Sequence, residues 1–176
     1  EIHSPQDAQN LGISTVYQEV NLCPNLTVAE NLFIGREPRK AGLIDWKTMN
    51  KRAAKLLQDL DIHADVTQTI DNYSIAIQQM IAIARAVDMS AKVLILDEPT
   101  SQLDPEGSDE VFRAVETLTG SGITILMIEQ KIEKLAAYCD RNLLLHKGKQ
   151  IAFDTPQKVF SMPDLNNYGI QAPAFT

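Results

Sequence analysis

Two adjacent carboxylates, Asp97 and Glu98, follow directly on four apolar residues, Val93 to Leu96. A short apolar run of this kind predicts a buried strand, which would deliver both carboxylates to one end of a sheet. Carboxylate oxygens suit Mg²⁺, and a second carboxylate can polarise the water that attacks a phosphate. We therefore expect Asp97 to hold Mg²⁺, directly or through a water, and Glu98 to act as general base toward a nucleotide γ-phosphate. A buried strand that ends in a solvated Asp-Glu turn gives the same short pattern.

A second candidate site lies at the start of a predicted helix, residues 75–87, which Ser74 precedes as N-cap. Its apolar residues recur at helical spacing: Met80, Ile81, Ala84 and Val87. A serine hydroxyl and the free N–H groups of a helix start together form an anion site. Ser74 is thus a candidate phosphate contact, although an ordinary capped amphipathic helix has the same pattern.

The first half of the chain is predicted to be mostly helical. A β-branched strand, Gly12 to Tyr17, leads into a polar loop that begins with Gln18. Thr27-Val28-Ala29-Glu30 has the form of a capping box and predicts a helix that ends near Gly35. Asp45 caps a further helix, Trp46 to Leu60, whose basic face we interpret as solvated.

From Val93 onward, strands alternate with helices, which predicts parallel strands joined by crossover connections. Asp104 and Pro105 begin a helix that Gly120-Ser121-Gly122 ends. The remaining predicted elements are a fully buried strand at 123–128, a helix at 131–138, a hairpin of 142–146 with 150–153, a helix from Thr155 to about Phe160, and a loose tail from Ser161.

The composition excludes several classes of protein. A net charge of −7 over 176 residues disfavours a nucleic-acid partner. Apolar runs such as Ile125 to Ile128 are far shorter than the ~20 residues of a membrane-spanning helix. Cys23 and Cys139 lie far apart without a metal-binding pattern, which fits a reducing, cytoplasmic setting. No signal peptide is visible at the start of the chain.

In their order along the chain, these features resemble the ATP-binding cassette (ABC) ATPases. Residues 91–100, followed by Ser101-Gln102-Leu103-Asp104, resemble the Walker B motif and D-loop of that family. Tyr73-Ser74-Ile75-Ala76-Ile77-Gln78-Gln79 stands where the family has its L-S-G-G-Q-Q-Q signature, and Gln18 resembles the Q-loop glutamine. The resemblance implies an α/β fold, a partial P-loop NTPase (RecA-like) core with a helical subdomain, in which the N-terminal strands and the phosphate loop are absent.

The resemblance also implies roles for individual residues toward ATP and Mg²⁺. Gln18 would contact Mg²⁺ or the attacking water and sense the membrane domain of a transporter. The signature residues Ser74, Ile75, Ala76 and Gln78 would face a γ-phosphate held by a second cassette, and Ser101 and Asp104 would lie at the seam between cassettes. Asp104 is also the helix cap, and both roles are compatible. Gln130 stands where the family usually has a γ-phosphate-binding histidine.

Three departures from the family pattern put turnover in doubt. Ile75 and Ala76 replace the signature glycines, which keeps the backbone further from phosphate. Gln130 can donate a hydrogen bond but cannot take up a proton. No G-x-x-x-x-G-K-S/T segment occurs in the chain. We therefore interpret the chain as a fragment of a nucleotide-binding domain that alone binds ATP very weakly and is inactive, with an uncovered sheet edge near Val93 to Leu96.

Different parts of the chain resemble two different subfamilies. Residues 1–100 resemble the first cassette of ribose- and galactose-type sugar importers, in segments such as Val16-Tyr17-Gln18-Glu19. Residues 101–160 are more similar to ATPases of the energy-coupling-factor type, in Met127-Ile128-Glu129-Gln130 for example. A chimera, recombination or divergence would each explain this change.

The resemblance implies four segments and a place in an importer. Residues 1–24 would end a core strand and form the Q-loop, 25–90 the helical subdomain, 91–160 half of the RecA-like core, and 161–176 the tail. The expected protein is the ATPase subunit of an ABC importer, for carbohydrates, peripheral on the cytoplasmic face of the inner membrane. Its expected partners are a second cassette, identical or in tandem, membrane permeases and, indirectly, a solute-binding protein. The alternatives are an ABC ATPase of DNA repair or translation, and a degenerate cassette that only dimerises or regulates.

Overall fold

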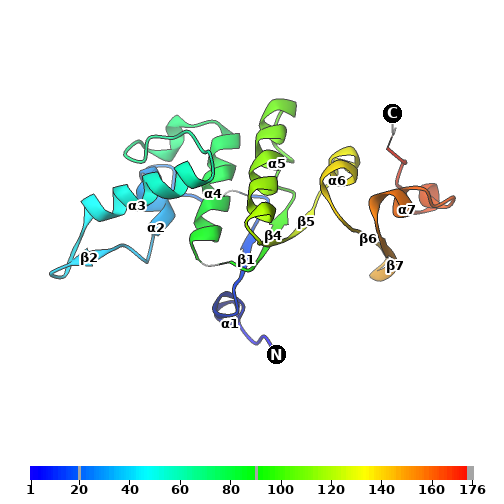
Figure 1. Cartoon of the computed structure of the whole chain (residues 1–176), viewed down its shortest axis with the longest axis horizontal. Coiled ribbons are helices and arrows are strands. Elements are labelled where there is room, and N and C mark those ends of the chain that lie inside the picture. Colours follow the sequence, from blue (N-terminus) through cyan, green and yellow to red (C-terminus); the bar gives the residue numbers. More distant parts are fainter. Residues whose placement is uncertain (20, 90, 174–176) are drawn as a thin grey trace. The chain divides into compact units, whose positions relative to one another are not determined.

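The computed structural model describes residues 1–19, 21–89 and 91–173. The chain forms two compact units, Glu1–Ile128 and Glu129–Thr176, which run from blue to yellow and from yellow to red in Figure 1. The division falls inside the predicted segment 91–160, whereas the predicted segments 1–24 and 25–90 share the first unit. None of the helices among the described residues is both long and apolar enough to span a lipid bilayer.

A parallel sheet of three strands, ordered β1-β4-β5, forms the centre of the first unit. The strands are β1 (Ile13–Val16), β4 (Val93–Asp97) and β5 (Thr124–Ile128). The predicted crossover arrangement is thus observed, with Asp97 as the last residue of the middle strand. The expectation of an uncovered edge at Val93 to Leu96 is wrong, because β4 pairs with a neighbour on each side.

Two helices, α4 (Ile75–Asp88) and α5 (Pro105–Gly120), pack with one face of this sheet. Leu94 and Leu96 point into that core and are fully buried. On β5 the alternate residues Leu126 and Ile128 remain 49% and 53% exposed. The prediction of a fully buried strand at 123–128 is therefore wrong, because β5 is an edge strand with only one face turned to the core.

The helical part of the first unit comprises α2 (Val28–Phe33), α3 (Trp46–Asp59), the 3₁₀ turn η1 (Ile70–Asn72) and α4. The predicted capping box is confirmed, since Thr27 and Glu30 exchange side-chain to backbone hydrogen bonds. The predicted end near Gly35 is confirmed, because α2 ends at Phe33 with Ile34 as its C-cap and Gly35 follows with a left-handed φ of 74°. The caps predicted for α3 and α4, Asp45 and Ser74, are confirmed as well.

A short helix and a hairpin in the first unit have no counterpart in the sequence prediction. Helix α1 (Pro5–Asn10) begins at a Ser4 N-cap before β1. Strands β2 (Arg39–Lys40) and β3 (Leu43–Ile44) pair antiparallel across a two-residue turn. Ala41 and Gly42 there have φ of 50° and 84°, as in a type I′ turn. Alanine is a poor signal for such a turn, because its Cβ disfavours positive φ.

The second unit is a hairpin covered by short helices. It contains α6 (Ile132–Tyr138), β6 (Asn142–His146), β7 (Lys149–Asp154), α7 (Pro156–Phe160) and the 3₁₀ helix η2 (Leu165–Tyr168). The predicted hairpin is confirmed. The prediction of a loose tail is wrong for η2. Leu165 is buried with Phe160, and the Tyr168 and His146 rings meet edge to face with their centroids 5.3 Å apart. Residues 174–176 of that predicted tail lie outside the described residues.

Candidate functional site

Gln18 and Glu98 meet at the carboxyl ends of two neighbouring parallel strands. Val16 of β1 pairs with Leu96 of β4, and each of the two polar residues lies two positions beyond this pair. Because both residues lie the same distance beyond a paired position, they are brought side by side. The Gln18 Nε2 donates a hydrogen bond of 3.2 Å to Glu98 Oε2. The structure thus joins the predicted Q-loop residue to the predicted general base.

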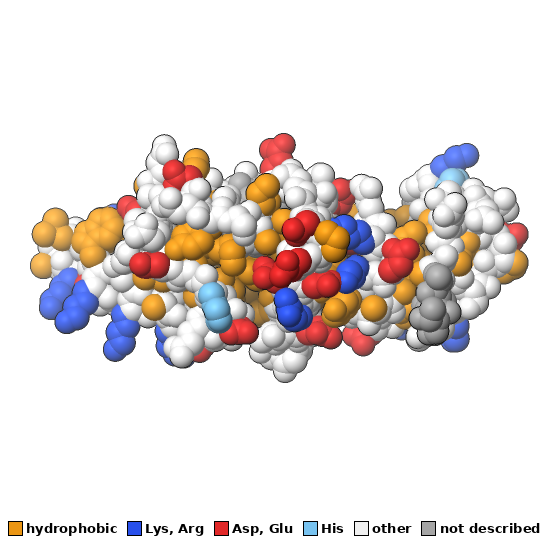
Figure 2. Space-filling model, turned by 90° about the horizontal axis from the view of Figure 1, so that it is seen from above, with side chains coloured by type: hydrophobic (Ala, Val, Ile, Leu, Met, Phe, Trp, Pro, Cys, Tyr) orange, Lys and Arg blue, Asp and Glu red, His pale blue; other side chains and the backbone are white. Residues whose placement is uncertain are grey.

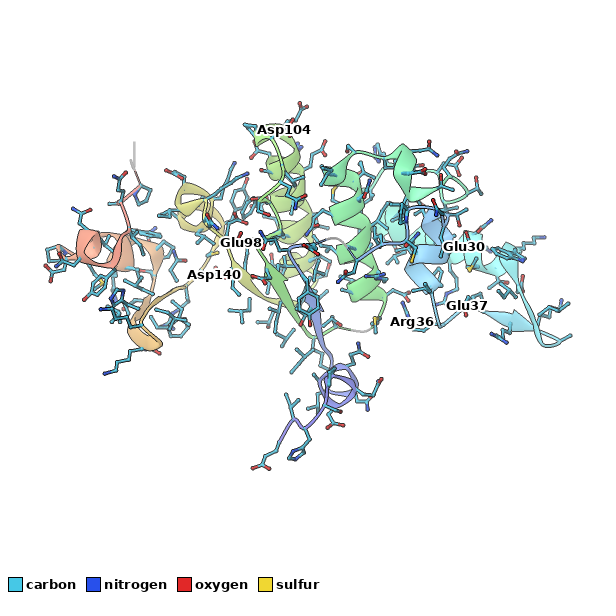
Figure 3. The ribbon with its side chains drawn as sticks, turned by 180° about the vertical axis from the view of Figure 1, so that it is seen from behind. Glu30, Arg36, Glu37, Glu98, Asp104 and Asp140 are labelled. Carbon is cyan, nitrogen blue, oxygen red and sulfur yellow. The ribbon has the colours of Figure 1, made fainter. Side chains whose placement is uncertain are left out.

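The backbone of Glu98 is held in an unusual conformation. Its φ of 44° lies in the left-handed region, which residues with a Cβ rarely adopt and which concentrates at functional sites. Its N–H donates to Ile128 O at 2.8 Å, and its carbonyl accepts from Ser101 N at 3.1 Å. The chain therefore leaves the sheet at Glu98, whose half-buried side chain is presented at the strand end (Figure 3).

Asp97, the last residue of β4, is half-buried and lies on the sheet face opposite Leu94 and Leu96. Among the described residues, no group of three or more His, Cys, Asp or Glu side chains is arranged to hold a metal. Mg²⁺ in nucleotide sites needs only one or two side-chain oxygens, with phosphates and waters as the other ligands. The Asp97 carboxylate and the Gln18 amide oxygen are each of the type that Mg²⁺ takes as a ligand.

The start of α4 offers an exposed serine at an open helix end. Ser74 Oγ accepts a long hydrogen bond of 3.4 Å from Ile77 N, and Ile75 is 47% exposed beside it. Ala76 instead faces α5. Its Cβ lies so near Gly107 that a Cβ added to this glycine would approach it to 3.0 Å. Gln78 is also engaged, since its Nε2 donates to Tyr73 O at 2.9 Å. Of the predicted signature residues, Ser74 and Ile75 are therefore the ones most open to a ligand.

Asp104 and Ser101 lie in the connection between β4 and α5. The Asp104 Oδ1 accepts from Gly107 N at 2.8 Å, which confirms its role as the helix cap. Both Ser101 and Asp104 are exposed, and Asp104 stands at the first turn of α5 (Figure 3). Their predicted place at a seam between cassettes stays a prediction.

Gln130 belongs to the second unit, whereas Gln18, Asp97 and Glu98 belong to the first. Within its own unit Gln130 is exposed, and its backbone N–H donates to Glu129 Oε1 at 3.2 Å. Its predicted action on a γ-phosphate stays a prediction.

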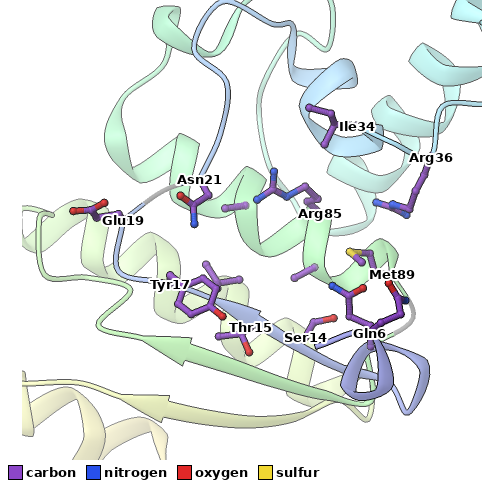
Figure 4. A pocket seen from close by; sticks show the side chains of 14 residues that line it. Gln6, Ser14, Thr15, Tyr17, Glu19, Asn21, Ile34, Arg36, Arg85 and Met89 are labelled. Carbon is purple, nitrogen blue, oxygen red and sulfur yellow. The ribbon is translucent and has the colours of Figure 1, made fainter. Parts of the chain in front are cut away.

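Sequence reasoning missed a cavity of about 520 Å³ beside the loop that carries Gln18. Its walls come from α1, β1, α4 and the end of α2, with Tyr17, Asn21, Arg36 and Arg85 among its polar residues (Figure 4). The sequence does contain one indication of this cavity, because Arg85 is the one cation in the otherwise largely apolar sequence of α4.

The Arg85 side chain lies in this cavity, which Glu19 also lines. Within the described part of the chain, no carboxylate forms an ion pair with it, while the neighbouring Arg36 pairs with Asp88 at 2.6 Å. Burial lowers the pKa of Arg85; the nearby Cys23 opposes this shift, and the charge of Arg36 adds to it. A half-buried cation that is left uncompensated attracts an anion.

Comparisons with known proteins find similarity to one family. The protein-family model described as "ABC transporter" matches residues 2–101. The galactofuranose transporter ATP-binding protein YtfR of Escherichia coli K12 is 45% identical over 141 residues, which are 80% of this chain and 28% of that protein. The ribose import ATP-binding protein RbsA 1 of Streptomyces avermitilis is 43% identical over 150 residues, 85% of this chain and 29% of its own length.

Solved structures share the fold. A nucleotide-free ATP-binding cassette from an ABC transporter superposes with a TM-score of 0.80 at 23% identity, over 96% of this chain and 72% of that one. The structure of an ATP-binding cassette of an ABC transporter in its ADP conformation gives a TM-score of 0.81 at 24% identity, over 95% of this chain and 71% of that one. The chain thus covers most of a solved cassette but only about three tenths of the curated relatives.

Proposed function

Because the chain belongs to the ABC transporter family of ATP-binding domains, we propose that it is part of an importer ATPase and supplies the water-activating side of an ATP site. The observation that carries this proposal is the hydrogen bond from Gln18 to Glu98 at the ends of β1 and β4. It supports a base whose carboxylate is oriented before substrate arrives.

In the proposed reaction, Glu98 accepts a proton from water while the water oxygen bonds to the γ-phosphorus of ATP. The bond from that phosphorus to the bridging oxygen breaks, and ADP leaves with the electron pair. Asp97, with the Gln18 amide oxygen, would hold Mg²⁺, which when bound offsets charge on the phosphate oxygens. The hydrogen bond from the Gln18 amide would orient the Glu98 carboxylate toward the attacking water.

A second cassette, identical or a tandem half, is the proposed partner at this site. The exposed Ser74 at the start of α4 would donate to a γ-phosphate held by that partner, where the free N–H groups of the helix end add to the attraction. A related fold has been solved as a dimeric ATP-binding cassette bound to ADP and phosphate. Ser101, Asp104 and Gln130 are proposed to lie near the same phosphate or the seam.

Membrane permeases are the second proposed class of partner, and a solute-binding protein would act through them. The cavity beside the Gln18 loop supports this part of the proposal, because Arg85 there can receive a carboxylate. A partner that enters the cavity would press on the loop that orients Glu98. The proposed location is accordingly the cytoplasmic face of the membrane, as a peripheral subunit.

Sugars are the proposed cargo, since the relatives are named for galactofuranose and ribose. A degenerate cassette that binds without turnover is the alternative that specific residues favour. Ile75 blocks the close approach of backbone that glycine allows, and the neutral Gln130 carries no positive charge toward phosphate.

ATP hydrolysis by the chain with a phosphate-loop segment placed before Glu1 separates these two proposals. We expect measurable turnover that Glu98→Gln lowers by about 10²–10⁴-fold, while binding of a fluorescent ATP analogue persists. The 176 residues alone are expected to bind the analogue very weakly. Binding without turnover in both the parent and the Glu98→Gln protein would instead support the degenerate cassette.

A further inference from the structure

The hairpin β2–β3 and the start of α3 concentrate positive charge in a protein of negative net charge. Residues 36–55 hold seven Lys or Arg and two acidic residues, while the whole chain has a net charge of −7. Figure 2 shows Lys, Arg and hydrophobic side chains together at the end of the first unit that carries β2 in Figure 1. Such segregation gives this end an electrostatic field opposite in sign to that of the whole protein.

Part of this charge is already used within the fold. Arg36 and Arg52 both pair with Asp88, at 2.6 and 3.6 Å, and the Arg52 guanidinium also lies 4.7 Å over the Phe33 ring. Lys55 pairs with Asp59 at 2.8 Å. Arg36 and Arg52 thereby join the end of α2 and α3 to α4, while Lys55 is paired within α3, so all three cations are already engaged.

Four further cations are exposed and have no ion pair in the part of the chain that the structure describes: Arg39, Lys40, Lys47 and Lys51. The two carboxylates nearby are directed at the backbone. Glu37 accepts from Gly35 N at 2.8 Å, and Asp45 accepts from Thr48 N at 3.1 Å as the cap of α3. The hairpin therefore presents cations to solvent while its acids stabilise its own turns.

Two large apolar side chains stand among these cations. Leu43 follows the tight turn of Ala41 and Gly42 and is 76% exposed, and Trp46 at the first position of α3 is 51% exposed. Paired backbone on β2 and β3 fixes Leu43, and the Asp45 cap fixes Trp46. A rigid apolar tip surrounded by Lys and Arg is the composition that inserts at the interface of an anionic bilayer.

We propose that Arg39, Lys40, Lys47 and Lys51 bind the anionic surface of a lipid membrane while Leu43 and Trp46 insert at the headgroup level. Phosphates of nucleic acid would attract the same cations, but an exposed leucine gains nothing from a phosphate backbone. Membrane binding by this surface is independent of the proposed ATPase site, because Gln18, Asp97 and Glu98 lie on other elements.

The experiment uses the whole chain and the fluorescence of Trp46, which is its only tryptophan. We expect a blue shift of its emission, and sedimentation with the lipid, on addition of vesicles of equal parts phosphatidylserine and phosphatidylcholine. Vesicles of phosphatidylcholine alone should give neither. Each of Lys47→Gln and Lys51→Gln should lower the partition coefficient about fivefold, and Leu43→Ser should reduce the blue shift.

The matched controls are the single variants Lys147→Gln and Lys149→Gln. Each removes one positive charge, as each test variant does, but from the exposed turn of the β6–β7 hairpin. We expect these controls to partition like the parent protein. Equal losses in the controls, an unshifted Trp46 emission, or full binding by Leu43→Ser would each overturn the proposal. So would binding of single-stranded RNA with no binding of the phosphatidylserine vesicles.

Discussion

The side-chain amide of Gln18 donates to the carboxylate of Glu98 across the carboxyl ends of β1 and β4, at 3.2 Å. The two residues are 80 positions apart in the chain, yet each stands two residues beyond the paired Val16 and Leu96. Any shift of the β1 loop therefore changes the surroundings of the proposed base directly.

Gln18→Glu would replace this donor with a second carboxylate. Two like charges at hydrogen-bond distance disfavour ionisation, so the pKa of Glu98 should rise. Because the base must be ionised to act, activity on the acid side of the pH profile should be lost at higher pH than in the parent. The measurement is the pH dependence of ATP hydrolysis by the chain supplied with a phosphate-loop segment. Gln18→Ala is the control, and a shift of equal size in both variants would contradict the argument.

Asn31→Ala should destabilise the first unit strongly. Asn31 is fully buried on α2, and its side chain accepts from Cys23 N at 2.7 Å and donates to the Cys23 and Leu26 carbonyls. Loss of the buried Asn31 side chain removes all of these hydrogen bonds, so the free energy of unfolding should fall by about 2–4 kcal/mol. Urea denaturation measures it. The exposed Asn10→Ala should change stability by less than about 0.5 kcal/mol.

Gly107→Val should force α5 away from α4. A Cβ at Gly107 already approaches Ala76 Cβ and Asp104 Oδ1 to 3.0 Å, so the branched side chain should cost about 1–3 kcal/mol of unfolding free energy. Gly120→Ala, at the end of the same helix, is the matched control, since no described atom lies within 4 Å of its added Cβ. Thermal denaturation should show a lower midpoint for the first variant and an unchanged or higher midpoint for the second.

Arg85→Met should lower the proposed stimulation of ATP hydrolysis by a permease without lowering the stability of the fold. Removal of an uncompensated, half-buried charge should leave the unfolding free energy unchanged or raise it by about 1 kcal/mol. In the assembled importer the same variant should lower permease-stimulated ATP hydrolysis, since the proposed carboxylate partner is lost. Arg113→Met, on the exposed side of α5, is the control for both measurements. A large loss of stability with Arg85→Met would show that the cation is compensated within the fold.

Periodicity and capping residues were sufficient to predict much of the first unit. Asp45, Ser74 and Asp104 each cap a helix where their type and spacing indicate one. The positions of Gln18 and Glu98 just beyond the ends of two strands were also predicted, although β1 ends at Val16 rather than Tyr17 and β4 at Asp97 rather than Leu96. Local hydrogen bonding decides these features, so a local pattern reports them.

Features that depend on distant neighbours were missed or wrongly assigned. The apolar alternation on β5 cannot show that Leu126 and Ile128 face solvent, because that depends on which strands and helices lie beside them. Leu165 is held by Phe160 and its neighbours, although a segment rich in proline and asparagine suggests a loose tail. The cavity at Arg85 arises from four elements that only the fold brings together.

The left-handed backbone of Glu98 also affects which variants a selection for stability would favour. A side chain with a Cβ is disfavoured at φ 44°, so Glu98→Gly should relieve strain of about 1 kcal/mol. A library screened only for heat resistance or expression would therefore enrich glycine at position 98, and its best folders would lack the proposed base. A screen for the proposed ATP hydrolysis would remove the same clones.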